Sequence, residues 1–199
     1  MSTLEATLRR VVTHLREQGA QFAVVGGLAV SARSEPRFTR DADLCVAVEA
    51  DSEAEAVVRG RRTAGYELLA LVEQDAVGRL ATARLADLHS AEGSTVVDLL
   101  FASSGIEREV VEQAEVIELF HGLEAPVATV PALLALKVLA RNDRTRPQDR
   151  LDALALLAIA TPEERRTTRG LLGSIERRGF ARGRDLSEAF DALMEEASR

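Results

Sequence analysis

Two aspartates separated by one residue are the most distinctive chemical feature of the sequence. Asp41 and Asp43 stand at the start of residues 42–48, where apolar side chains alternate with others. Such alternation predicts a strand, in which residues i and i+2 point to the same face, with Cα atoms about 7 Å apart. Two carboxylates at that distance repel each other unless a cation lies between them. The pair therefore predicts a divalent metal site.

A third carboxylate lies further along the chain in a different predicted strand. Asp98 stands inside the apolar and β-branched stretch Thr95–Phe101. Burying a lone ionised carboxylate among apolar residues is costly, so a metal ion or an opening at this point would remove the difficulty. Asp98 is therefore the third candidate metal ligand.

Two glycines precede these acids and predict a phosphate site. Gly26 and Gly27 follow the predicted strand 22–25 and lead into a predicted helix over 28–34. Glycine lets a ligand come close to the backbone, and the free amides at the start of a helix bind anions.

The pattern around these residues predicts a mixed α/β part in the N-terminal half of the sequence and helices after it. In the first part, the sequence predicts helices over 3–18, 28–34, 53–64 and 106–114, and strands over 22–25, 42–48, 95–101 and 116–119. Residues 66–87 predict two strands joined near 75–78, and a loop is expected through Pro126. From Thr129 onward the pattern is helical. The expected division is an α/β core over 1–128 and a helical region over 129–199 that completes the active site.

Composition narrows the class of protein. The formal net charge of −7 argues against a general nucleic-acid binder. The charge is uneven, because residues 1–136 carry 12 basic and 21 acidic side chains, whereas residues 137–184 carry 12 and 6. The one cysteine cannot form an internal disulfide, and no apolar run is long enough to cross a membrane. We expect a cytoplasmic protein without a membrane partner.

The combination of motifs resembles the polymerase-β-like nucleotidyltransferase superfamily. Its signature is a hydrophobic residue, Gly-Gly or Gly-Ser, a spacer, Asp-x-Asp and a later carboxylate. The matching residues are Val25-Gly26-Gly27, then Asp41-Ala42-Asp43 after thirteen residues, and Asp98. The resemblance implies that fold and a transfer of NMP from a bound NTP.

The same resemblance assigns roles to these side chains. Asp41, Asp43 and Asp98 would bind two Mg²⁺ ions, with Mn²⁺ as the alternative, for an in-line displacement. The second glycine replaces the serine of many members, so backbone amides or Ser31 must hold the phosphate instead. Arg40 is a further candidate nucleotide contact, with an ordinary loop cation as its alternative.

The helical region resembles the AbiEii group of that superfamily. Residues 130–141 contain Lys137 on an apolar helix, and Asp149 follows twelve residues later. In the AbiEii group a lysine and an aspartate are paired in this way, and many members are toxins of toxin–antitoxin pairs, some acting on tRNA. The resemblance implies that Lys137 contacts the triphosphate, that Asp149 acts on the acceptor side, and that RNA and an antitoxin are partners.

Several residues also have a purely structural explanation as an alternative to a functional role. Lys137 is the single lysine among 25 basic residues, which favours a function because the chain otherwise uses arginine, although it could simply complete an amphipathic helix. Asp149 and Asp152 could stabilise a helix N-terminus. Arg33 and Arg37 flank the Asp-x-Asp loop and could contact phosphates or balance the carboxylates, or be ordinary loop cations. The arginines between 165 and 184 could contact RNA or form a solvated helix face.

Two other functions stay open from the sequence. A small-molecule nucleotidyltransferase of the aminoglycoside type shows the same Gly-Gly and Asp-x-Asp pattern. A catalytically idle binding module with this fold is the third hypothesis, but it has no need for a repelling pair of aspartates.

Overall fold

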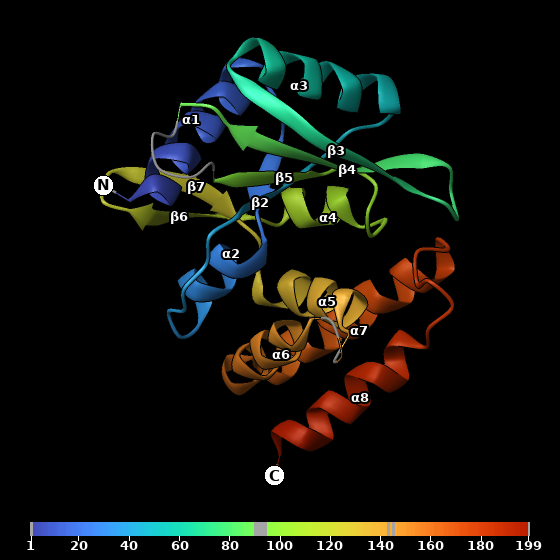
Figure 1. Ribbon diagram of the computed structural model, residues 1–199. Coiled ribbons are helices and arrows are strands. Elements are labelled where there is room, and N and C mark those ends of the chain that lie inside the picture. The colour runs from blue at the N-terminus through green and yellow to red at the C-terminus, as the bar shows by residue number, and fades with distance from the viewer. Residues whose placement is uncertain (1, 90–94, 143, 145, 199) are drawn as a thin grey trace.

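A computed structural model describes residues 2–89, 95–142, 144 and 146–198 (Figure 1). The helices are α1 (Thr3–Glu17), α2 (Gly26–Arg33), α3 (Asp51–Thr63), α4 (Glu107–Glu112), α5 (Val130–Ala140), α6 (Pro147–Ile159), α7 (Pro162–Arg177) and α8 (Leu186–Ala197). The strands are β1 (Phe22–Val24), β2 (Ala42–Val46), β3 (Tyr66–Gln74), β4 (Arg79–Asp87), β5 (Val96–Leu100), β6 (Glu115–Phe120) and β7 (Leu123–Val127).

The strands form one mixed sheet in the order β3-β4-β5-β2-β1-β7-β6. Strand β2 runs parallel to β5, and β1 runs parallel to β7, whereas the other neighbouring pairs are antiparallel. Strands β2 and β5, which carry Asp43 and Asp98, are therefore adjacent at the centre of the sheet, and Asp41 directly precedes β2.

Helices cover the sheet on two sides. In Figure 1, α1 and α3 lie above the sheet, and α2, α4 and the helices α5–α8 lie below it. The apolar side chains of α1 explain its position, because Leu8, Val11, Val12 and Leu15 are fully buried. Ser2 caps this helix by accepting a hydrogen bond from the amide of Glu5 at 3.2 Å.

The helical region is built around α5, whose residues are almost all buried against its neighbours. Helix α7 begins with a capping box, in which Thr161 and Glu164 exchange hydrogen bonds between side chain and backbone. Pro162 fits the first turn, where its missing N–H has no helical partner to lose. The structure thus confirms the predicted mixed α/β fold followed by C-terminal helices. Within the described residues, no helix is long and apolar enough to cross a membrane.

The expected loop through Pro126 is wrong, because residues 123–127 form strand β7 and pair with β6. The alternation is present, since Leu123, Ala125 and Val127 are buried and Glu124 is exposed. Proline cannot donate to a strand ladder, which argues against a strand at this position. The strand tolerates Pro126 because its pairing with β1 involves one residue pair, Val24 with Val127.

Candidate active site

A cleft of about 880 Å³ separates the sheet from α5 and the start of α6. Its walls come from the end of β1, the start of α2, strands β2 to β5, and the loop between α7 and α8. We call it the carboxylate cleft, because all the predicted acidic residues line it: Asp41, Asp43, Asp98 and Asp149. Segments far apart in the sequence thus meet at one concave surface.

The sheet places the motif aspartates side by side. The parallel register of β2 and β5 sets Asp43 directly opposite Asp98, and Asp41 precedes β2 in the same cleft wall. Gly26 makes this arrangement feasible in two ways. Its φ is +62°, and a Cβ atom built on it would lie 1.9 Å from the Oδ2 atom of Asp43. Any side chain at position 26 would therefore displace the carboxylate.

The pKa of Asp43 is raised in this acidic surrounding. Burial raises the pKa of Asp43 to about 6, and the charges of Asp98 and Asp41 raise it as well. Lys137 and Arg146 act in the opposite direction but do not compensate. An opposite charge placed between these carboxylates would relieve the repulsion, which is the role of a divalent cation.

The donor set fits a divalent ion only in part. Carboxylate oxygens are suitable ligands for Mg²⁺, and Asp41 and Asp43 share one cleft wall. Among the described residues, however, three acidic, histidine or cysteine side chains are not gathered closely enough to hold an ion together. Asp98 is engaged elsewhere, since Arg84 donates to its Oδ1 at 2.9 Å and to its Oδ2 at 2.6 Å. Arg84 is not among the residues predicted from the sequence.

Lys137 lies at the centre of a buried ion-pair network on the other wall of the cleft. Its Nζ atom is 2.7 Å from Asp149 and 2.8 Å from Asp152. Asp152 also receives two hydrogen bonds from Arg37, at 2.7 and 2.8 Å, and one from Gln148 at 3.0 Å. The structure therefore brings Lys137 and Asp149 together, and it adds Asp152, to which the sequence patterns gave less weight. A second acid three residues after Asp149 was the available signal.

The pKa of Asp152 is lowered by its charged and hydrogen-bonded partners. Burial alone would raise the pKa of its carboxyl, but hydrogen bonds from Arg37, Gln148 and Lys137 outweigh burial and hold the pKa below its usual value. Arg37 also fills the space beside Gly27, because a Cβ atom there would lie 2.5 Å from the guanidinium. The second glycine of the motif thus leaves room for the arginine that links the loop before β2 to α6.

Ser31 and Arg40, the two side chains predicted to contact the nucleotide, differ in their position relative to the cleft. The hydroxyl of Ser31 donates to the carbonyl oxygen of Gly27 at 3.0 Å and accepts from the amide of Arg37 at 3.2 Å, and Ser31 does not line the cleft. Arg40 does line it, with its guanidinium 5.4 Å from the centre of the Phe38 ring. The backbone amides at the start of α2 are therefore better candidates than Ser31 for binding the phosphate.

Further arginines stand at the rim of the cleft. Arg146 lies 4.0 Å from Asp149, and Arg182 reaches the rim from the loop between α7 and α8. Arg182 has a φ of 56°, the one positive φ at a non-glycine residue in the described part of the chain. Burial, Arg146 and Arg184 lower the pKa of Arg182. Like charges crowded together favour the binding of an anion.

Most arginines of the helical region hold the protein together instead. Of the seven between 165 and 184, all of them described, only Arg182 lines the cleft. Arg178 pairs with Glu109 at 2.5 Å, and Arg184 donates to the carbonyl oxygens of Leu139 and Arg141. Of this cluster, Arg182 is therefore the residue that faces the cleft.

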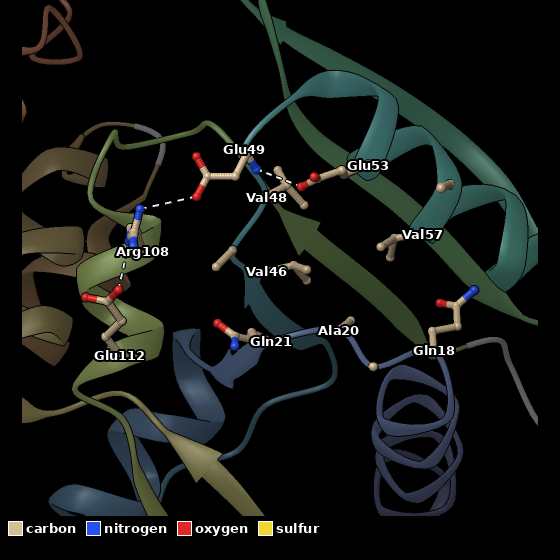
Figure 2. A pocket seen from close by; sticks show the side chains of 13 residues that line it. Gln18, Ala20, Gln21, Val46, Val48, Glu49, Glu53, Val57, Arg108 and Glu112 are labelled. Atoms are coloured by element: carbon tan, nitrogen blue, oxygen red, sulfur yellow. Dashed lines mark hydrogen bonds and ion pairs between the residues drawn. The ribbon is translucent and has the colours of Figure 1, made fainter.

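A second hollow, of about 620 Å³, lies at the other end of β2 and contains none of the motif residues. Arg108 links Glu49 and Glu112 across it, at 3.2 and 2.8 Å, and Glu53 accepts a hydrogen bond from the Glu49 amide (Figure 2). Its arginine is thus paired with two of its glutamates, and Glu53 is bound to a backbone amide. The chemistry suggested by the sequence therefore belongs to the carboxylate cleft.

Comparison with known families agrees with this arrangement. The family model described as "Nucleotidyl transferase AbiEii toxin, Type IV TA system" matches residues 10–199, nearly the whole chain. The match includes the glycines, all the cleft aspartates and Lys137. No curated protein sequence matches the chain.

Solved structures share the fold. An antigenic nucleotidyltransferase-like protein from Paracoccidioides brasiliensis is 18% identical, with a TM-score of 0.54, 95% of this chain covered and 92% of that one. The antibiotic-resistance factor ANT(2'')-Ia is also 18% identical, with a TM-score of 0.50 and coverages of 98% and 92%. At this identity the likeness shows the nucleotidyltransferase fold alone.

Proposed function

Because the chain belongs to the AbiEii nucleotidyltransferase toxin family, we propose that it transfers an NMP from an NTP to a hydroxyl group of RNA, with tRNA as the preferred acceptor. The observation that carries this proposal is the gathering of Asp41, Asp43, Asp98 and Lys137 in one cleft. Family membership indicates nucleotidyl transfer in general. The RNA acceptor, the metal dependence and the residue roles are our proposals.

The reaction joins the acceptor oxygen to the α-phosphorus, while the bond from that phosphorus to the pyrophosphate oxygen breaks. Two bound Mg²⁺ ions, or Mn²⁺, would neutralise phosphate charge and lower the pKa of the acceptor hydroxyl. Asp41 and Asp43 would hold the first ion, and Asp43 and Asp98 the second. Asp98 is also the candidate acceptor of the proton that the hydroxyl loses.

The other cleft residues bind and orient the nucleotide. The amides of Gly26 and Gly27 open α2 and are suited to phosphate oxygens. An ammonium has three N–H donors, so pairing with Asp149 and Asp152 does not exhaust Lys137, and a remaining donor can reach a phosphate. Asp149 would then fix the ammonium and orient a group on the acceptor side. We accordingly propose that residues 129–199 complete the site begun by residues 1–128.

The charge of the cleft rim favours RNA over a cationic drug as acceptor. Arg40, Arg84, Arg146 and Arg182 all line the cleft. These guanidinium groups attract phosphates and would repel the ammonium groups of an aminoglycoside. The negative net charge of the whole chain does not oppose this, because charges close to the acceptor act on it more strongly than distant, screened ones.

Transfer of label tests the proposal. Each α-³²P-labelled NTP is incubated with the protein and Mg²⁺, in one set with total RNA and in another with an aminoglycoside mixture. We expect label in RNA. Label on the small molecules alone would support the rival enzyme, and absence of both transfer and Mg²⁺–NTP binding by calorimetry would support the idle module.

We further propose that the protein works in the cytoplasm with a cognate antitoxin encoded nearby. The toxin–antitoxin system named for its family supports the existence of an antitoxin. Growth arrest on expression, relieved by co-expression of the neighbouring gene, would support this. It is a property of the cell and can fail while the transferase activity stands.

A stacking contact at the cleft mouth gives a specific prediction. Phe38 lines the cleft, is 79% exposed and carries Arg40 against its ring, so it can stack on a base. Stacking on an aromatic ring is worth about 1–3 kcal/mol per base, so Phe38→Ala should raise the KM for NTP or RNA about tenfold. The melting temperature should hardly change.

The matched control is Val116→Ala, which trims another exposed apolar side chain on β6 away from the cleft. Steady-state kinetics for NTP and for RNA show which substrate uses the ring. Equal KM values for Phe38→Ala and wild type, with both substrates, would contradict the stacking role.

A further inference from the structure

Three side chains form a row across adjacent strands at the centre of the carboxylate cleft. The register sets Arg84 of β4 opposite Asp98 of β5, and Asp98 opposite Asp43 of β2. Arg84 donates one hydrogen bond to each carboxylate oxygen of Asp98, at 2.9 and 2.6 Å. Strand pairing, rather than a chance surface contact, therefore brings the guanidinium to the third carboxylate.

This ion pair occupies the atoms that a metal ion would use. A guanidinium that donates to both oxygens of a carboxylate is a strong bidentate contact. It takes up one lone pair on each oxygen of Asp98 and places a positive charge beside the carboxylate. A divalent cation at Asp98 therefore has to compete with Arg84 for the same two oxygens and for their charge.

Arg84 is held less firmly than the acid that it binds. Its side chain is 47% exposed, whereas that of Asp98 is 12% exposed. The guanidinium therefore has room to turn within the cleft, but Asp98, in the middle of the sheet, does not. Arg84 also does not neutralise the site completely, since Asp98 still raises the pKa of Asp43.

We propose that Arg84 competes with a divalent cation for Asp98. In the metal-free protein Arg84 closes the third ligand position. Binding of a cation with an NTP opens it, because the guanidinium exchanges the carboxylate for a phosphate of the nucleotide. This inference rests on the proposed metal-dependent transfer, and it adds a positioning residue that controls when the metal site is complete.

Binding of Mn²⁺ alone to the intact protein tests the competition without any catalysis. Free Mn²⁺ is followed by electron paramagnetic resonance for wild type, Arg84→Gln and Arg84→Lys. A hydrogen-bonded charge pair contributes enough that Arg84→Gln should lower the Kd for Mn²⁺ about tenfold or add one bound ion. Arg84→Lys keeps the charge without the bidentate contact, so its Kd should lie between the two.

Arg79→Gln is the matched control. Arg79 also lies on β4 and pairs with an aspartate, Asp51, at 3.0 Å, but it does not line the cleft. Its Mn²⁺ affinity should equal that of wild type. A second arm measures binding of a non-hydrolysable NTP with Mn²⁺, which Arg84→Gln should weaken because the phosphate partner is lost.

The outcomes separate this inference from the proposed function. An unchanged or weaker Mn²⁺ affinity in folded Arg84→Gln overturns the competition, and if that variant melts below the assay temperature, Arg84→Lys decides by the same criterion. If wild type binds Mn²⁺ and Asp41→Asn does not, the metal site stands even when the competition fails. If no variant binds Mn²⁺ with or without NTP, the metal-dependent function fails too.

Discussion

Replacing Asp43 with asparagine should abolish NMP transfer and, in metal-free buffer, stabilise the protein above about pH 6. The loss of activity follows from removing a charged oxygen from the proposed metal site, and we expect transfer to fall about 10³-fold or more. The gain in stability follows from the environment of Asp43, which disfavours its ionised form in the folded state.

The direction of the pH effect follows from linkage. The folded-state pKa of Asp43 is raised to about 6 from an ordinary value of 3.8. Folding therefore favours the protonated acid, so this contribution to stability is fully present below about pH 4 and is lost as the pH rises through 6. The difference between the two pKa values corresponds to about 3 kcal/mol, which wild type loses at neutral pH and Asp43→Asn does not.

Urea unfolding in EDTA measures the effect at pH 4.5 and 7.5. The free energy of unfolding of Asp43→Asn should exceed that of wild type by about 1 kcal/mol at the lower pH and by about 3 kcal/mol at the upper one. Asp75→Asn, in the exposed turn between β3 and β4, is the control and should show no such difference. Equal stabilities at both pH values would show that the carboxylates of the cleft do not strain the folded protein.

Sequence patterns predicted the site best where one short segment contains the whole signal. Asp41 and Asp43 share a face because strand geometry alone requires it. Position 26 has a positive φ and no space for a Cβ atom, and only glycine meets both requirements readily. The prediction that these elements face Asp98 came from resemblance and is matched by the register of β2 and β5.

The residues that were missed or given too little weight depend on contacts between distant segments. Arg84 meets Asp98 through the pairing of β4 with β5, and the sequence does not specify that register. Arg37 and Asp152 are separated by 115 residues and meet because α6 packs beside α2. Strand β7 was missed for a local reason, since Pro126 interrupts an otherwise regular alternation. Long-range packing and rare exceptions to local rules therefore set the limit of the sequence analysis.

Removal of Asp152 is the change with the largest expected effect on stability. Its carboxylate is 2% exposed and lies between two cations, Arg37 and Lys137, with a hydrogen bond from Gln148. Asp152→Ala would leave two partly buried positive charges with one fewer partner. Breaking a buried pair in this way costs about 3–5 kcal/mol, because the remaining charge stays desolvated.

Thermal and urea unfolding at pH 7 measure this loss, with Asp191→Ala as the matched control. Asp191 also pairs with an arginine, Arg169 at 2.6 Å, but the side chains are 51% and 44% exposed, so its removal should cost less than about 1 kcal/mol. The difference between the variants should shrink at low pH, because the pKa of Asp152 is held below its ordinary value and its contribution is lost once the acid is protonated. A loss no larger than that of Asp191→Ala would mean that Arg37 and Lys137 are not held by this carboxylate. The ammonium of Lys137 would then be positioned by Asp149 without help from Asp152.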